Sequence, residues 1–124
     1  MVSRQTKGQL EAKIAALATA FERDQMARGP REVCAWIIED LILIRLKGVL
    51  TPAEERLSPD STGRYLLKQV RTRLIETSRG ILEEAIESLT GVSTVSLHND
   101  LSIRTGEQIL VLALAEDLEA RFRP

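Results

Sequence analysis

The sequence predicts an α+β fold in which a four-stranded, mainly antiparallel sheet packs against helices. Three observations predict it. Apolar residues recur with helical spacing in long segments, two pairs of short apolar segments are typical of hairpins, and the order along the chain is helix, hairpin, helices, hairpin. The chain has 124 residues, enough for one domain with a core of its own, so we treat residues 1–124 as a single domain.

The first helix is predicted over residues 4–27. Its apolar residues repeat every three or four positions, which places them on one face of a helix: Leu10, Ile14, Leu17 and Phe21. Gly29 and Pro30 end the segment, because glycine tolerates a left-handed cap and proline cannot continue a helix.

The next two segments, 32–38 and 41–48, are predicted to form a hairpin, since they are rich in β-branched and aromatic residues. A two-residue turn at Glu39 and Asp40 places Glu32 opposite Lys47, a favourable pair of opposite charges. One face of this hairpin is then wholly apolar: Val33, Ala35, Ile37, Ile42, Ile44 and Leu46. The other face carries four large apolar residues as well: Trp36, Ile38, Leu41 and Leu43.

A helix start follows at Thr51, where Pro52 suits the first helical position and Glu54 completes a capping box. This helix is short because Pro59 interrupts it. A longer helix is predicted from 61 to 90, capped by Gly91. Residues 78–80 lie in a gap between two apolar blocks, so we expect a kink or break there.

A second hairpin is predicted from strands at 92–97 and 108–115, with its tip at 104–107. A turn there would put Arg104 opposite Glu107. The first of these strands can extend through residues 99–103 with a bulge. We expect a frayed turn or a short helix at 116–124.

The composition excludes several classes of protein. Seventeen Lys and Arg against 18 Asp and Glu give a charge of −1, which argues against general nucleic-acid binding. The longest apolar run, 109–115, is too short to span a membrane, and no signal-peptide core follows the N-terminus. A single cysteine, Cys34, cannot form an internal disulfide, so we expect a cytoplasmic protein.

Several segments together resemble the MpsC-like family of small bacterial proteins. The most specific is the stretch Arg45–Glu54 (Arg-Leu-Lys-Gly-Val-Leu-Thr-Pro-Ala-Glu). Weaker ones are Gly29-Pro30, Trp36–Asp40, Thr90-Gly91, Ser96–Asp100 and Thr105–Glu107. The resemblance covers nearly the whole chain, and the family name implies a link to a sodium-translocating, membrane-potential-generating system. It brings no catalytic motif, so no active-site residue follows from it.

Candidate chemical groups are sparse. Basic side chains offer an anion site, although a solvated surface is the commoner role of such residues: Arg45, Arg64, Lys68, Arg71 and Arg104. His98 and Asp100 form a possible polar or catalytic site, and Cys34 becomes a nucleophile only if it is paired with His98. With one histidine, the sequence predicts no metal site, and we expect no cofactor.

The apolar second face of the first hairpin is the most informative feature. Either the helices cover both faces of the sheet, or a second subunit covers the side with Trp36, Ile38, Leu41 and Leu43. We expect the second arrangement, as a homodimer or higher oligomer.

Three functional hypotheses follow. The first is a non-enzymatic accessory or regulatory protein of a membrane ion-translocating system, which associates with itself and has a membrane transport protein as a candidate partner. The second is a small-ligand or anion sensor with a basic pocket, in which His98 responds to pH. The third is a small enzyme using His98 and Asp100.

Overall fold

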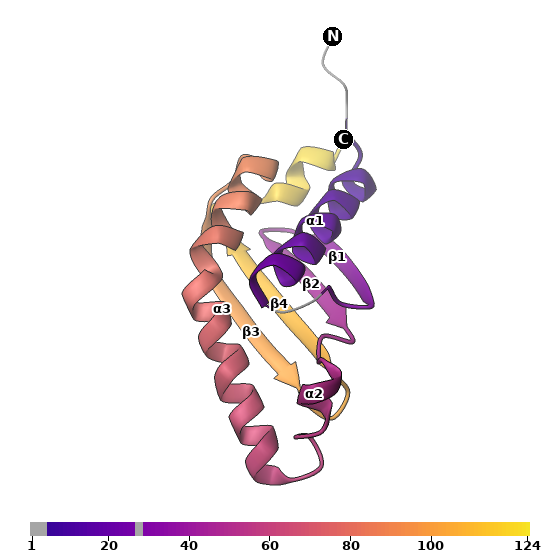
Figure 1. Ribbon diagram of the computed structural model, residues 1–124. Helices are drawn as coiled ribbons and strands as arrows, with labels where there is room; N and C mark the ends of the chain where they lie inside the picture. Colours follow the sequence, from indigo (N-terminus) through magenta and orange to yellow (C-terminus); the bar gives the residue numbers. More distant parts are fainter. Residues whose placement is uncertain (1–4, 27–28) are drawn as a thin grey trace.

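A four-stranded antiparallel sheet forms the centre of the protein, with its strands in the order β1-β2-β4-β3 (Figure 1). The computed structural model describes residues 5–26 and 29–124. The strands are β1 (Glu32–Ile38), β2 (Leu41–Lys47), β3 (Thr94–Ser102) and β4 (Glu107–Leu114). The helices are α1 (Lys7–Phe21), α2 (Pro52–Glu55) and α3 (Ser61–Thr90), with a π-helical turn at Glu22–Met26 and a 3₁₀ turn at Leu118–Phe122. The predicted fold class is confirmed.

The register of the first hairpin is the predicted one. Glu32 lies opposite Lys47, Trp36 opposite Leu43 and Ile38 opposite Leu41. The turn between the strands places Glu39 at φ 55°, a left-handed conformation that non-glycine residues adopt only rarely. The pairing of the strands therefore determines this hairpin, rather than a favourable turn sequence.

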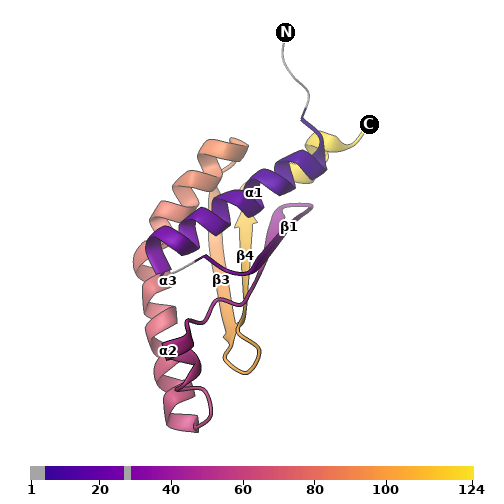
Figure 2. The same cartoon turned by 45° about the vertical axis from the view of Figure 1, so that its right-hand side comes forward.

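Both long helices cover the same face of the sheet. In Figures 1 and 2, α1 crosses in front of the sheet and α3 runs alongside β3; α1 also contacts α3. On the covered face the side chains are buried, among them Ile37, Ile44, Leu110 and Leu112. The alternative in which α1 and α3 cover opposite faces is wrong, and no helix in residues 5–26 and 29–124 lies over the outer face of the sheet.

The edge strand β1 is also held by α1. The side chain of Glu11 crosses from α1, and its Oε2 accepts a hydrogen bond from the backbone N–H of Ile37 at 2.9 Å. A carboxylate thus occupies a backbone donor in the middle of the strand.

The helix ends follow capping chemistry. Thr51 Oγ1 accepts from the N–H of Glu54 at 3.1 Å, and Glu54 Oε1 accepts from the N–H of Thr51 at 2.8 Å, so the predicted capping box is confirmed. Thr6 caps α1 in the same way, with Gln9 as its partner. Gly91 ends α3 with φ 78°, as predicted.

Three expectations are corrected. The break predicted at 78–80 does not occur, because α3 is one helix of 30 residues in which buried Ser78 continues the packed stripe, although the axis of α3 curves along its length (Figures 1 and 2). The first helix turns π-helical at Glu22, and its predicted ends at residues 4 and 27 lie outside the described residues. Strand β3 begins at Thr94 rather than 92, and its irregularity falls between Thr94 and Ser96 rather than at 99–103.

Candidate functional site

The outer face of the sheet carries a continuous apolar surface. Across the strands, Trp36 lies beside Leu43 and Leu43 beside Val111, while Ile38 lies beside Leu41. Trp36 is 39% exposed and Ile38 is 46% exposed, although both are large apolar side chains. We call this surface the sheet patch; it comprises Trp36, Ile38, Leu41, Leu43, Ile109, Val111 and Ala113.

Charged residues border the sheet patch, and each is neutralised within the chain. Arg45 Nε contacts Glu107 Oε2 at 2.6 Å, and Lys47 Nζ lies 3.8 Å from Glu32 Oε2. The border is therefore electrically balanced, and the apolar centre is left for contact with another surface.

The polar residues of β3 do not form a catalytic group with Cys34. His98 Nε2 shares a hydrogen bond of 3.2 Å with Ser96 Oγ, and Asp100 contacts Lys68 Nζ at 2.9 Å. The Lys68 ammonium holds the pKa of Asp100 below its ordinary value, which makes this carboxylate a weak base. Cys34 is on β1 and His98 on β3, at opposite edges of the sheet, so about 14 Å of sheet separates their strands.

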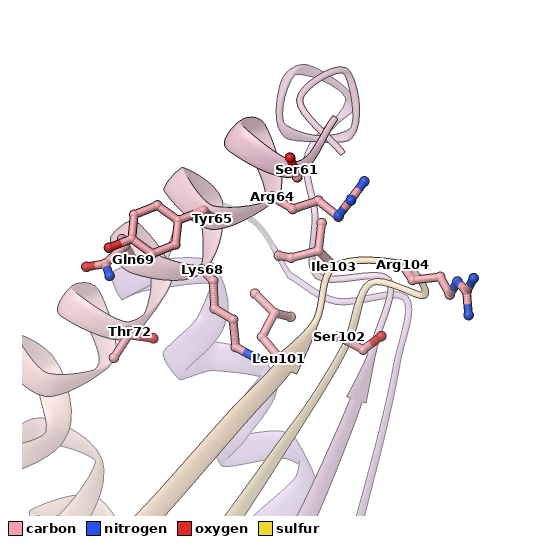
Figure 3. Close-up of a pocket in the computed structure, with 10 residues that line it drawn as sticks. All are labelled: Ser61, Arg64, Tyr65, Lys68, Gln69, Thr72, Leu101, Ser102, Ile103 and Arg104. Carbon is pink, nitrogen blue, oxygen red and sulfur yellow. The ribbon is translucent and has the colours of Figure 1, made fainter. Parts of the chain in front are cut away.

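Three of the five basic candidates line a groove between α3 and the turn that joins β3 to β4, with the guanidinium groups of Arg64 and Arg104 pointing away from Lys68 (Figure 3). Arg64 and Lys68 extend from α3, and Arg104 extends from the turn. The groove has a volume of about 540 Å³ and is also lined by Ser61, Tyr65, Gln69, Thr72, Leu101, Ser102 and Ile103. Arg64 Nη1 donates to the carbonyls of Ser58 and Pro59, whereas the structure gives the Arg104 side chain no partner within the described residues. Arg45 is elsewhere, at the border of the sheet patch.

Arg71 lies in the core instead of joining this groove. Its Nη2 donates to the Val49 carbonyl at 2.6 Å and to Glu54 Oε1 at 2.8 Å, and its Nη1 lies 3.7 Å from Glu22 Oε2. Both Arg71 and Glu22 are buried. We call Arg71, Glu22 and Glu54 the buried ion cluster; it links α3 to the π-helical turn after α1 and to α2.

The two acids of the cluster have pKa values that are shifted in opposite directions, although burial raises both. Burial raises the pKa of Glu22 to about 7; Arg71 lowers that pKa, but neither Glu22 oxygen accepts a hydrogen bond within the described chain. Burial also raises the pKa of Glu54, but hydrogen bonds from Arg71 and Thr51 outweigh it, and the net pKa lies below its ordinary value. Glu54 is thus the permanent counter-ion of Arg71, and Glu22 titrates near neutral pH.

Sequence reasoning missed this cluster, although a signal was present. Arg71 lies four residues after Leu67 and four before Ile75, so it occupies the buried stripe of α3 rather than its solvated face. Glu22 carries no such signal, because it lies where α1 becomes π-helical.

Residues 5–26 and 29–124 contain neither a cluster of metal ligands nor a helix that could span a membrane. Nowhere in this part of the chain do three His, Cys, Asp or Glu side chains gather where they could hold a metal ion. In the same residues, no helix combines the length and apolar character that a membrane span requires.

Comparison with known proteins places the chain in a family. Residues 6–116 match the family described as "Na+-translocating membrane potential-generating system (MpsC)". The chain belongs to the MpsC family. It is 39% identical over 116 residues to the "Uncharacterized protein YbcI" of Bacillus subtilis (strain 168), which covers 94% of each chain. No solved structure shows a significant match.

In this MpsC protein, the specific stretch Arg45–Glu54 has a clear structural role. It supplies the Val49 carbonyl and the Glu54 carboxylate that hold Arg71, and Thr51 orients Glu54 through the capping box. The stretch that carries the resemblance noted in the sequence therefore supplies part of the buried ion cluster.

Proposed function

We propose that this protein is a non-enzymatic accessory or regulatory component of a membrane Na+-translocating system, which acts in the cytoplasm through protein–protein contacts and self-association. The family description supports the link to Na+ translocation. The observation that carries the mode of action is the sheet patch, an apolar surface on three adjacent strands that no element of the described chain covers. The half-buried, unpaired thiol of Cys34 suits a reducing compartment.

The proposed occupant of the sheet patch is a second copy of the chain. Surfaces of this kind mark interaction sites, because burying apolar area removes it from water. Two sheets pack face to face about 10 Å apart, and a twofold contact lets each patch cover the other. The ion pairs at the border, Arg45–Glu107 and Glu32–Lys47, allow two identical faces to approach without net repulsion.

The test compares two substitutions of equally exposed residues. Ile38 in the patch is 46% exposed and Leu57, outside it, is 45% exposed. Sedimentation of the wild type should show an oligomer that Ile38→Asp dissociates and Leu57→Asp does not, with melting temperatures recorded for all three. A monomeric wild type, or equal behaviour of the two variants, would refute self-association through the patch.

The link to Na+ translocation needs its own experiment. Tagged wild type should recover subunits of the Na+-translocating system from native membranes, in larger amount than an untagged control. If none of these subunits is recovered, the accessory role is wrong, whatever the oligomeric state.

A second candidate function is a sensor for small anions, and the groove of Figure 3 favours it. Three cationic side chains line this groove, and Arg104 makes no ion pair in the described residues. His98 lies on the outer face of the sheet and does not line it. Inorganic phosphate or bicarbonate should raise the melting temperature of the wild type but not of Arg104→Ala; the same response in both would exclude this site.

A further inference from the structure

The helix α3 carries a second apolar stripe on a side that the sheet does not cover. Leu66, Val70 and Ile81 are 52%, 54% and 52% exposed, and Leu74, which is half-buried against the core, continues the same spacing. This stripe differs from the one that packs on the sheet, which includes Leu67, Ile75, Leu82 and Ile86. We call it the α3 stripe; it comprises Leu66, Val70, Leu74, Thr77, Ile81 and Ala85.

The α3 stripe is symmetric about the middle of the helix. The midpoint of α3, Ser61–Thr90, lies between Ile75 and Glu76. Leu74 and Thr77 are equally far from this midpoint, as are Val70 and Ile81, and as are Leu66 and Ala85. If a second copy of α3 lies antiparallel to the first with their midpoints level, the α3 stripes of the two copies therefore face each other, residue against residue.

A shallow groove lies along the middle of the stripe. It has a volume of about 300 Å³ and is lined by Gln69, Val70, Arg73, Leu74 and Thr77. In the antiparallel arrangement, the side chains that reach this level are Thr77 and Ile81 of the second copy. The stripe thus offers both the ridge and the hollow that helix packing requires.

The charges of α3 are complementary in the same arrangement. Arg64, Lys68 and Arg73 give the first half a charge of +3 apart from buried Arg71, while the second half has four glutamates and one arginine, a charge of −3. The order opposes the helix dipole, which favours acids near the start and bases near the end, so it does not serve the isolated helix. In an antiparallel pair each basic half lies along an acidic half, with Arg73 bordering the α3 stripe while Arg64 and Lys68 line the groove of Figure 3.

Ion pairs within the chain already engage several of these charged groups, and Arg73 is a cation that they leave. Lys68 pairs with Asp100, and Arg79 pairs with Glu76 and Glu83. Arg73 makes no ion pair in the described chain, and it lies beside the stripe. Across the pair, Arg73 falls within two residues, about 3 Å along the axis, of Glu76 of the second copy.

We propose that α3 pairs antiparallel with α3 of a second copy through the α3 stripe, with the twofold axis at the helix midpoint. This contact lies on a different surface from the sheet patch and does not depend on it. A chain with both contacts assembles beyond a dimer, since each surface binds one further copy.

Cysteine crosslinking tests the geometry. In a Cys34→Ser background, Val70→Cys and Ile81→Cys are prepared as separate proteins. In the proposed pair, Val70 faces Ile81 of the other copy, whereas the two Val70 residues lie 11 positions, about 16 Å, apart along the axis. A disulfide needs Cα atoms within about 7 Å, so the mixture should crosslink at least about tenfold more than Val70→Cys alone.

Controls separate this contact from the others. A mixture of Val70→Cys with Val95→Cys, which is exposed but lies off α3, should not crosslink. Repeating the experiment with Ile38→Asp present should preserve the crosslink, because the sheet patch is not involved. Equal crosslinking by Val70→Cys alone, or none in the Val70→Cys and Ile81→Cys mixture, would overturn the proposal.

Discussion

Replacement of Glu22 by Gln gives the sharpest test of the buried ion cluster. The Glu22 carboxyl is buried, lies 3.7 Å from Arg71, and accepts no hydrogen bond from the described residues. Its pKa is raised from 4.5 to about 7, chiefly by burial. Gln has nearly the same shape as protonated Glu and cannot ionise, so the variant removes the cost of a buried negative charge while Glu54 still pairs with Arg71.

The sign and size follow from proton linkage. Between pH 4.5 and 7 the unfolded chain has lost the Glu22 proton while the folded protein retains it, so the free energy of unfolding falls as the pH rises. The contribution of protonated Glu22 to the free energy of unfolding is complete below pH 4.5 and is lost as the pH rises through 7. At about 1.4 kcal/mol per pH unit the loss totals about 3 kcal/mol, most of it between pH 5 and pH 8.

Urea denaturation at pH 5 and pH 8 measures this difference. The wild type should lose about 2 to 3 kcal/mol more of its free energy of unfolding between pH 5 and pH 8 than Glu22→Gln does. Glu116→Gln, which changes an exposed carboxylate, is the control and should track the wild type at both. If the Glu22→Gln and wild-type stabilities change in parallel, Glu22 does not titrate as the structure indicates.

Three further predictions concern stability and are checked by the same denaturation at pH 7. Arg71→Met should cost about 3 to 5 kcal/mol, because it leaves two acids without their buried cation; a smaller loss than that of an exposed Arg56→Met control would contradict this. Gly63→Ala should destabilise by about 2 kcal/mol, since an added Cβ would collide with the Leu57 carbonyl oxygen. Gly80→Ala, with open space around the added Cβ, should instead stabilise α3 by about 1 kcal/mol. If both glycine substitutions change the free energy of unfolding in the same direction, the space around these two glycines is not as described.

The sequence predicted the local elements well because their signals are local. The first hairpin follows from cross-strand chemistry, in which Glu32 meets Lys47 and apolar residues meet one another. The starts at Thr51 and the end at Gly91 follow from capping, which depends on a few adjacent residues. The face of the sheet on which each helix packs could not be predicted in this way, because it depends on contacts between segments that are distant in the sequence.

The candidate site was only partly predictable for the same reason. Trp36 and Ile38 were placed correctly on the second face of the hairpin, since the register fixes the face of every side chain. Arg71 was placed with Arg64 and Lys68 among the candidates for an anion site, although its position also fits the stripe of α3 that packs in the core. A charged residue in that stripe is recognisable as a buried ion-pair partner only once the fold is known, because Glu54 and Glu22, which lie beside Arg71, are far from it in the sequence.

The carboxylate of Glu11 against the backbone of Ile37 has a consequence for solubility. A bare strand at the margin of a sheet is a template on which other chains add and grow into fibrils. The Glu11 carboxylate already accepts the hydrogen bond from the Ile37 N–H, so a strand added at β1 would have to displace that carboxylate. The margin is thereby guarded against aggregation, and loss of that guard, as in Glu11→Ala, should shorten the lag before fibril-binding dyes respond.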